Sequence, residues 1–300
     1  MKKILITGAN SYIGTSFEKW LGQWKEQYKV ETVDMIDGTW KDKDFSEFDV
    51  VFHVAGIAHV SSDPKLEDLY YKVNRDLAIE TAKKAKNEGV KQFVFMSSII
   101  VYGAINHINH KIVIDKNTVP EPNNFYGRSK LQAEEGIMPL QDDNFNVVVM
   151  RPPMIFGKGS KGNYPKLAKM TLWLLIFPDV KNERSMLHID NLCEFIRLMI
   201  ENEERGMFYP QNAEYVGTSE LVKLVAEAHG KRIVLTRMFN PVLKLMGSFV
   251  GQVNKAFGNL VYEKSMSEYR ENYRIRDLKE AVMVTEEVTD VVSDGRCAEI

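Results

Sequence analysis

A tyrosine and a lysine four residues apart form the first pair in the sequence that could move a proton. Tyr126 and Lys130 lie in a segment with a helical pattern, so both side chains would share one face of the helix. A nearby ammonium stabilises a phenolate and would lower the tyrosine pKa from about 10 toward neutrality. Such a tyrosine can act as a general acid or base. An incidental surface pair has the same spacing, so the interpretation needs support from other residues.

Ser98 lies where a serine hydroxyl could hold a substrate beside that tyrosine. It follows the apolar run 93–96, and open parallel sheets bind ligands at the carboxyl ends of their strands. A nucleophilic serine is the alternative, but no Gly-x-Ser-x-Gly sequence surrounds Ser98. We therefore expect Ser98 to bind the substrate rather than to attack it.

The first apolar run ends in a glycine turn that could hold a pyrophosphate. Gly8 would make the turn, and Gly14 would let the following helix pack on the sheet. Asp34 ends the second apolar run, twenty residues after Gly14. A carboxylate there accepts hydrogen bonds from a ribose 2′-hydroxyl and repels a 2′-phosphate, although a solvated turn residue is the alternative. The turn and the acid together predict NAD rather than NADP as the cofactor.

Short apolar runs alternate with helix-length segments in the first half of the chain. The runs are rich in Val, Ile and Phe and do not alternate with polar residues, which is typical of strands covered on both faces. This order predicts an α/β fold with a doubly wound parallel sheet, the Rossmann arrangement. The expected strands are residues 4–7, 30–33, 50–54, 93–96 and 147–150, and the expected helices are residues 11–24, 64–87 and 124–140.

The pattern changes after a Gly- and Lys-rich stretch that ends at residue 162. We expect residues 1–162 to form the NAD-binding domain, with part of 184–211 returning to it. Residues 163–300 would form a smaller mixed α/β substrate-binding lobe, of which the polar segment 288–300 would be poorly ordered. In this second half, helices are expected at residues 166–177, 190–202, 218–229 and 241–257, and short strands at 207–209 and 233–235.

Composition and charge exclude several classes of function. The chain has 39 basic and 41 acidic residues, so its net charge of −2 gives no reason to expect nucleic acid as a partner. Two cysteines exclude a disulfide framework. His107 and His110 lie in a loop without a cysteine or a carboxylate cluster, so we expect no metal site.

Targeting and membrane signals are weak. The start resembles a signal peptide, but its apolar run breaks after three residues. No run approaches the roughly eighteen apolar residues of a membrane span. We expect a soluble cytoplasmic protein without an integral membrane segment. The segments 173–177 and 242–250 are conspicuously apolar; core packing or a subunit contact is the default interpretation, and peripheral membrane attachment is the alternative.

Taken together, these motifs resemble the extended short-chain dehydrogenase/reductase family, and within it the nucleotide-sugar epimerases and reductases. The resemblance extends from residue 1 to about residue 190. It is carried by the glycine turn 7–14, His53-Val54-Ala55-Gly56, Val73-Asn74, Ser97-Ser98 with Val101-Tyr102-Gly103, Tyr126 with Lys130, Arg151-Pro152, and the segment from Arg184 to Asp190.

The resemblance implies roles for individual residues. Ser98, Tyr126 and Lys130 match the family's catalytic residues, and Ser98 would also contact the substrate together with Asn163 and Arg184. The arginine would bind the diphosphate, for which a guanidinium is well suited. Positions implied to contact or support NAD are Gly8, Asn10, Ser11, Tyr12, Ile13, Gly14, Asp34, Ala55, Gly56, Asn74, Tyr126, Lys130 and Pro153.

The chain differs from the family pattern at two points, and the resemblance also implies a subunit interface. Ser11 replaces the usual middle glycine, but it is small and can donate a hydrogen bond, so we expect NAD binding to survive. The second lobe is short for the family. Similar enzymes form homodimers through two helices, here those after Asn74 and Tyr126. Apolar contacts could come from Tyr70, Tyr71, Leu77 and Leu131.

The two residues after Ser98 indicate which of the family's reactions this chain can catalyse. The family's dehydratases carry an acid pair where this chain has Ile99 and Ile100, so sugar dehydration is not expected. The resemblance implies epimerisation of a nucleotide sugar, a UDP-hexose or UDP-N-acetylhexosamine at carbon 4 through a transient 4-keto sugar, in polysaccharide biosynthesis. An NAD(P)H-dependent 4-ketoreductase would use the same residues, and the preference for NAD favours the epimerase. A non-catalytic NAD-binding scaffold would require a broken triad, and the triad is intact.

Overall fold

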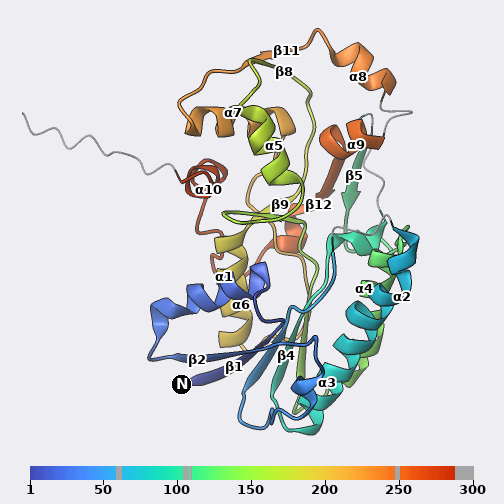
Figure 1. The fold of residues 1–300 in the computed structure, drawn as a ribbon, viewed down its shortest axis with the longest axis vertical. Coiled ribbons are helices and arrows are strands. Elements are labelled where there is room, and N and C mark those ends of the chain that lie inside the picture. The colour runs from blue at the N-terminus through green and yellow to red at the C-terminus, as the bar shows by residue number, and fades with distance from the viewer. Residues whose placement is uncertain (59–62, 104–107, 109, 247–250, 288–300) are drawn as a thin grey trace, which may run out of the picture.

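Six parallel strands form the sheet of the larger lobe, in the lower part of Figure 1. The computed structural model describes residues 1–58, 63–103, 108, 110–246 and 251–287. Its strand order is β10-β6-β4-β3-β1-β2, so the chain starts in the middle and reverses direction between β1 and β3. The predicted doubly wound parallel sheet is confirmed. The strands are β1 (Lys2–Thr7), β2 (Tyr28–Val33), β3 (Val50–His53), β4 (Gln92–Met96), β6 (Asn146–Met150) and β10 (Gly206–Phe208).

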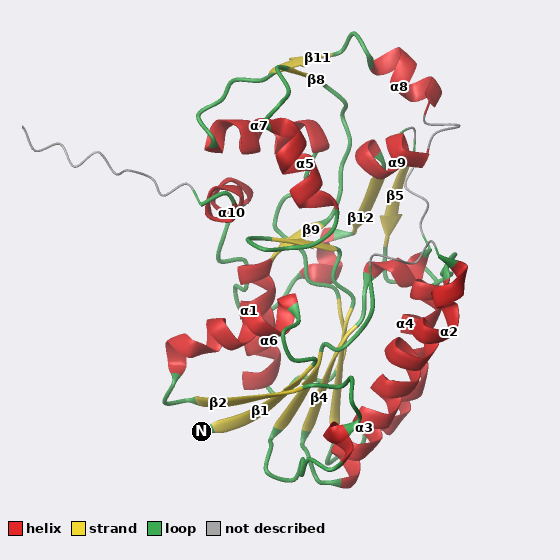
Figure 2. Cartoon of the chain, in the orientation of Figure 1, coloured by secondary structure: helices red, strands yellow, loops and turns green. Residues whose placement is uncertain are grey.

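Helices cover both faces of this sheet because alternate strand residues point to opposite sides. Ile4 and Ile6 pack under α1 (Tyr12–Leu21) and α6 (Ile189–Glu201), whereas Leu5 belongs to the opposite cluster. Figure 2 shows the helices of that opposite face to the right of the sheet. They are α2 (Glu67–Tyr70), the π-helical turn η4 (Tyr71–Asp76), α3 (Leu77–Asn87) and α4 (Phe125–Ile137).

The smaller lobe lies above the sheet in Figure 1 and is built from three two-stranded pairs and short helices. β7 (Met154–Phe156) pairs with β9 (Met186–His188), β5 (Lys111–Ile114) with β12 (Asn259–Tyr262), and β8 (Ile176–Pro178) with β11 (Val234–Thr236). The helices are α5 (Asn163–Thr171), α7 (Thr218–Ala228), α8 (Asn240–Met246), α9 (Gly251–Phe257) and α10 (Leu278–Thr285). Across the described ranges, no helix combines the length and apolar character needed to cross a membrane.

Two sequence predictions for this lobe need correction. The helix expected over 166–177 was wrong, because α5 ends at Thr171 and residues 176–178 form β8. Strands of three or four residues are too short to show a period, so β5, β7, β9 and β12 were not predicted. The helix expected over 241–257 corresponds to α8 and α9. Residues 247–250 between them, and the segment 288–300, lie outside the described residues.

Exposure separates the apolar residues around 175 into two groups. Leu174 and Phe177 pack in a core with Phe257, as the default interpretation expected. Trp173 and Leu175 are 82% and 73% exposed, so core packing was wrong for these two. Tyr70 shows the opposite error: it is fully buried against Phe125 and cannot supply a subunit contact.

Candidate active site

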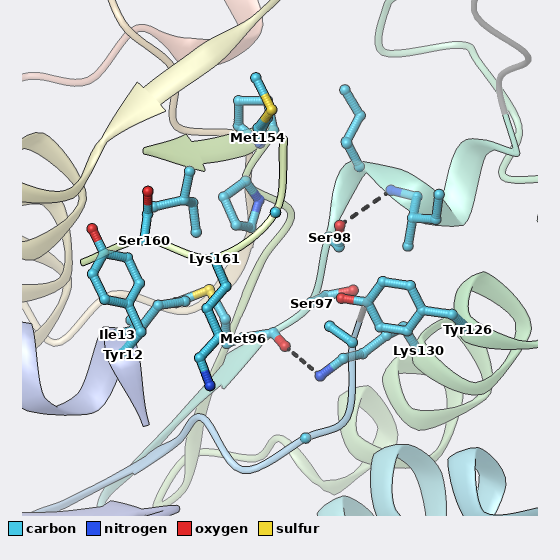
Figure 3. A pocket seen from close by; sticks show the side chains of 18 of the residues that line it. Tyr12, Ile13, Met96, Ser97, Ser98, Tyr126, Lys130, Met154, Ser160 and Lys161 are labelled. Atoms are coloured by element: carbon cyan, nitrogen blue, oxygen red, sulfur yellow. Dashed lines mark hydrogen bonds between the residues drawn. The ribbon is translucent and has the colours of Figure 1, made fainter. Parts of the chain in front are cut away.

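A cleft of about 690 Å³ lies at the carboxyl ends of β1, β3, β4 and β6, where the smaller lobe meets the sheet. This size suits a cofactor together with a substrate, and its position is the one expected for open α/β sheets. Many of the predicted site residues line it, and Figure 3 shows several of them from close by. They are Asn10, Ser11, Tyr12, Ile13, Gly56, Ser98, Tyr126, Lys130, Pro153, Asn163 and Arg184.

The glycine turn has the geometry that close approach to a phosphate requires. Gly8 has φ +93°, and a Cβ there would lie 2.9 Å from the Cα of Ala55. A Cβ on Gly14 would lie 2.6 Å from Oγ of Ser11, which caps α1 by accepting from the Gly14 amide at 3.2 Å. The first turn of α1 holds no acidic residue, and two of its residues, Tyr12 and Ile13, line the cleft. This open helix N-terminus favours an anion.

Four other predicted cofactor residues lie near the cleft but do not line it: Gly8, Gly14, Asp34 and Ala55. Asp34 is exposed just after β2, and its Oδ1 accepts from the Ile36 amide at 2.8 Å. The Gly8 amide donates to the Val33 carbonyl at 3.0 Å, which puts Asp34 next to the glycine turn. Ala55 packs directly against Gly8 of the turn, and Gly14 packs against the side chains of Ile6 and Val54.

Asn74 is a supporting residue in this structure. It is fully buried, and its Oδ1 accepts from the Ile57 amide at 2.8 Å. Its Nδ2 donates to the Ile57 carbonyl at 3.1 Å and to Oγ of Ser129 at 3.3 Å. The side chain therefore ties the loop after β3 to α4, the helix that carries Tyr126.

Ser98 and Tyr126 are brought together by the close packing of two local elements. Ser98 caps the 3₁₀ turn η5 (Ile99–Tyr102) by accepting from the Ile100 amide at 3.3 Å. This turn lies against the start of α4, where a Cβ on Gly127 would be 2.8 Å from the Ile100 carbonyl oxygen. Ser98 and Tyr126 both line the cleft, and both side chains face it (Figure 3).

The pKa of Tyr126 differs from the sequence prediction. Burial raises it to about 12, the nearby Ser98 hydroxyl opposes that rise, and the neighbouring Tyr70 adds to it. The expected lowering by Lys130 is absent because that ammonium donates to the Met96 carbonyl at 2.8 Å, as drawn in Figure 3. Burial lowers the pKa of Lys130 itself to about 8, against the opposing charge of Glu134.

A buried polar network beneath the triad was missed by the sequence analysis. Glu134 accepts from Nε of Arg151 at 3.1 Å and also from the hydroxyl of Ser97, the neighbour of Ser98. Arg151 in turn donates to Oη of Tyr102 at 2.8 Å. The signal was available: Glu134 follows Lys130 by four residues, and an arginine follows β6 directly. The network fixes α4 to the ends of β4 and β6.

Arg184 also lines the cleft. The Arg184 guanidinium is partly buried, and it forms no hydrogen bond or ion pair with any residue in the described part of the chain. Burial lowers its pKa. Its backbone is held by Val216, with amide-to-carbonyl distances of 3.1 and 2.9 Å. A fixed, unpaired guanidinium in a cleft is suited to a phosphate group.

The loop between β7 and α5 adds cleft residues that were not predicted. Ser160 and Lys161 line the cleft, and Figure 3 shows the Lys161 side chain extending across it. Asn163, which was predicted, begins α5 at the same edge. Lys161 adds a second positive charge to the cleft that Arg184 also lines. His107 of the excluded metal pair lies outside the described residues.

Gly127→Ala tests whether the spacing of Ser98 and Tyr126 matters. The added Cβ would meet the Ile100 carbonyl at 2.8 Å, so η5 and α4 must separate. We expect kcat to fall about 100-fold, because misplacement by about an ångström has that effect on oriented groups. Steady-state kinetics with thermal melts measure it. Gly22→Ala is the control, because its added Cβ meets no atom within 4 Å, and it should change neither kcat nor the melting temperature. Equal kcat values for the two variants would contradict the packing argument.

Lys130→Met tests the cost of the buried ammonium. Its pKa of about 8, against an ordinary value near 10.5, means that the folded protein releases this proton first. Between pH 8 and 10.5 the unfolded chain holds the extra proton, so the stability of the native protein rises with pH in that window. The full cost, about 3 kcal/mol, is present below pH 8.

We therefore expect Lys130→Met to be more stable than the native protein at pH 7 by about 1–2 kcal/mol, after the lost hydrogen bond to Met96 is subtracted. Urea unfolding at pH 7 and pH 10 measures the difference, which should shrink at the higher pH. Lys83→Met, on an exposed position of α3, is the control and should show the pH dependence of the native protein. A difference that stays constant between the two pH values would refute the argument.

The fold and the cleft define a class: a dinucleotide-binding oxidoreductase with a Ser-Tyr-Lys site. Residues 4–209 match the NAD dependent epimerase/dehydratase family. The chain belongs to this family, and it is an NAD-dependent nucleotide-sugar epimerase or reductase.

Related proteins agree with this assignment. The chain is 31% identical over 254 residues to a UDP-glucose 4-epimerase of Vibrio cholerae, covering 77% of this chain and 76% of that protein. It is 26% identical over 274 residues to the N-acetyl-alpha-D-glucosaminyl-diphospho-ditrans,octacis-undecaprenol 4-epimerase of Escherichia coli O157:H7, covering 85% and 81%. A UDP-glucuronic acid 4-epimerase of Bacillus cereus in complex with NAD shares the fold, with a TM-score of 0.71, 16% identity and coverage of 95% and 98%.

The residues present fit NAD. The glycine turn and the open N-terminus of α1 suit the pyrophosphate, and the Asp34 carboxylate beside them suits a ribose. When bound, NAD supplies a hydride acceptor and a positively charged nicotinamide ring. Within the described ranges, no group of three or more His, Cys, Asp or Glu side chains could hold a metal ion.

Proposed function

We propose that this protein interconverts the C4 epimers of a UDP-hexose or UDP-N-acetylhexosamine through a transient 4-keto sugar. The observation that carries the proposal is the unpaired Arg184 guanidinium, which lines the same cleft as Ser98 and Tyr126. A diphosphate at Arg184 would leave the attached sugar free to lie against the hydroxyl pair. The sequence similarity to a UDP-glucose 4-epimerase supports carbon 4 as the reacting position.

Each side chain has a defined part in this reaction. Ser98 holds the C4 hydroxyl, and Tyr126 takes its proton and later returns it. Because burial raises the pKa of Tyr126 to about 12, the phenol ionises near neutral pH only with added positive charge. Lys130, one turn further along α4, would supply such charge only by turning from the Met96 carbonyl toward the phenol. Ile99 and Ile100 line the cleft, but their side chains have no acidic group. These two positions therefore cannot protonate a leaving hydroxyl, as a dehydratase would require.

Proton NMR of the sugar anomeric signals tests the proposal directly. The protein is incubated with catalytic NAD and either UDP-glucose or UDP-N-acetylglucosamine. The galacto epimer should appear without net formation of NADH. If neither sugar changes while a UDP-4-keto sugar is reduced at the expense of NADH, the enzyme is a 4-ketoreductase. If bound NAD supports neither reaction, the proposal of a UDP-sugar epimerase is wrong.

A second candidate is the same epimerisation on a sugar joined through its diphosphate to a polyprenol. The similarity to the Escherichia coli undecaprenol-linked epimerase, which extends over 85% of the chain, favours it. Arg184 would bind the diphosphate in either substrate. A parallel NMR experiment with N-acetylglucosaminyl-diphospho-undecaprenol in detergent separates the two, since turnover of this lipid alone would exclude UDP-sugars as the substrate.

Two further properties belong to the proposal. We place the enzyme in the cytoplasm, where nucleotide sugars are made, with a role in polysaccharide biosynthesis. We also propose a homodimer through the exposed faces of α3 and α4. Leu77 and Leu131 are partly exposed there, and Arg75 donates to Gln132 at 3.0 Å beside them. Analytical ultracentrifugation tests the dimer.

A further inference from the structure

The end of the smaller lobe farthest from the sheet carries large apolar side chains in solvent. This lies at the top of Figure 1, around β8, β11 and α8. We call these residues the tip patch. They are Trp173 (82% exposed), Leu175 (73%), Ile176 (53%), Val234 (61%), Met238 (75%) and Leu245 (68%).

The patch is the outer side of a layer whose inner side is already packed. The parallel pairing of β8 with β11 puts Ile176 beside Val234, both facing solvent. Their strand neighbours Phe177 and Leu235 point the other way and pack in the core of the lobe. Because Phe177 and Leu235 already pack against the core of the lobe, the exposed side chains on the outer face do not contribute to that core. Exposed apolar groups of this extent mark an interaction surface.

The charge around the patch is strongly positive. The two segments that carry it, residues 166–181 and 231–245, contain seven basic residues and one acid. The acid, Asp179, is paired with Arg237 at 2.8 Å. Lys166, Lys169 and Arg232 are exposed. The whole chain has a net charge of −2, so this concentration of positive charge is local.

We propose that the tip patch docks on an anionic lipid bilayer. Its apolar side chains would enter the headgroup region, and the surrounding lysines and arginines would contact lipid phosphates, the combination that holds interfacial proteins on membranes. A second copy of the chain is a poorer occupant. A twofold contact would bring each patch against itself and place basic residues on basic residues.

Docking would bring the cleft close to the membrane surface. Helix α5 begins with Asn163 at the edge of the cleft and ends with Thr171, two residues before Trp173. Nine helical residues span about 13 Å. A docked enzyme would therefore act within a short distance of the lipid headgroups, whichever diphosphate sugar it uses.

Vesicle flotation tests the proposal without any substrate, so its outcome is separate from that of the proposed function. The native protein is mixed with vesicles of phosphatidylcholine alone, or of equal parts phosphatidylcholine and phosphatidylglycerol. We expect it to float with the anionic vesicles and to be released by high salt. Failure to bind the anionic vesicles would overturn the proposal.

Three variants locate the contact. Trp173→Asp with Leu175→Asp, and separately Lys166→Gln with Lys169→Gln and Arg232→Gln, should each reduce the bound fraction about tenfold or more. All five side chains are exposed, so the fold is retained. Ile36→Asp, at an exposed apolar position in the sheet lobe, should bind as the native protein does. Unchanged binding in both patch variants would overturn the proposal. So would a dimer in solution that the aspartate variant dissociates, because the patch would then join two copies.

Discussion

Tyr126→Phe is expected to lower kcat by a factor of about 100 to 10,000, the range in which positioned proton transfer contributes to catalysis. Phenylalanine keeps the ring that packs against Tyr70 at a centroid distance of 5.8 Å. It removes only the hydroxyl that faces the cleft near Ser98 and that exchanges a proton with the substrate in the proposed reaction. The dissociation constant for NAD should stay within about threefold of the native value, because the glycine turn and α1 are untouched.

Tyr28→Phe is the matched control. Its hydroxyl donates to Glu201 at 2.6 Å, and the residue begins β2 at the edge of the sheet opposite the cleft. Turnover by Tyr28→Phe should equal that of the native protein within about twofold. Turnover is measured by coupled assay or NMR, and NAD binding by calorimetry. A Tyr126→Phe enzyme that keeps more than about a tenth of the native kcat would remove Tyr126 from its assigned role.

The parts of the site that could be predicted are those whose geometry is local in the chain. A strand, a tight turn and a helix follow one another from Lys2 to Leu21, so the glycine turn together with Asp34 indicates a dinucleotide site. The spacing of Tyr126 and Lys130 is likewise fixed by one helix. Ser98 required a further step, since its place depends on the general rule that ligands bind at strand carboxyl ends.

The environment of these groups could not be predicted in the same way. Whether Lys130 faces the phenol or the Met96 carbonyl depends on the packing of β4 against α4, which are distant in sequence. The expected lowering of the tyrosine pKa failed for that reason. The network of Glu134 with Arg151 joins two elements that only the folded chain brings together.

The smaller lobe was predicted least well because its elements are short. Strands of three residues such as β8 show no period, and a run of large apolar residues reads equally as core or surface. Only the fold shows that Phe177 is buried while Ile176, the residue before it in β8, is 53% exposed. Side-chain alternation in a strand accounts for such a difference once the strand is known.

Arg184→Gln is expected to raise KM about 100-fold while changing kcat much less. Two charge-assisted hydrogen bonds from a guanidinium to a diphosphate contribute about 3 kcal/mol, which corresponds to a factor of roughly 100 in binding. Because the diphosphate is remote from the reacting carbon, this energy is shared by the ground state and the transition state and appears mainly in KM. Steady-state kinetics with the UDP-sugar identified by NMR provide the measurement.

The stability of this variant distinguishes a binding residue from a structural one. A partly buried guanidinium without a partner costs desolvation energy, so glutamine should leave the melting temperature unchanged or raise it. Arg197→Gln should behave in the opposite way, because Arg197 donates to Glu194 at 2.7 and 2.9 Å on α6. Its loss removes the ion pair of Glu194 and leaves this carboxylate the hydrogen bond from the Trp20 indole at 3.1 Å, so stability should fall while KM stays constant. If Arg184→Gln instead lost stability and kept its KM, Arg184 would be structural, and the cleft would need another group for the diphosphate.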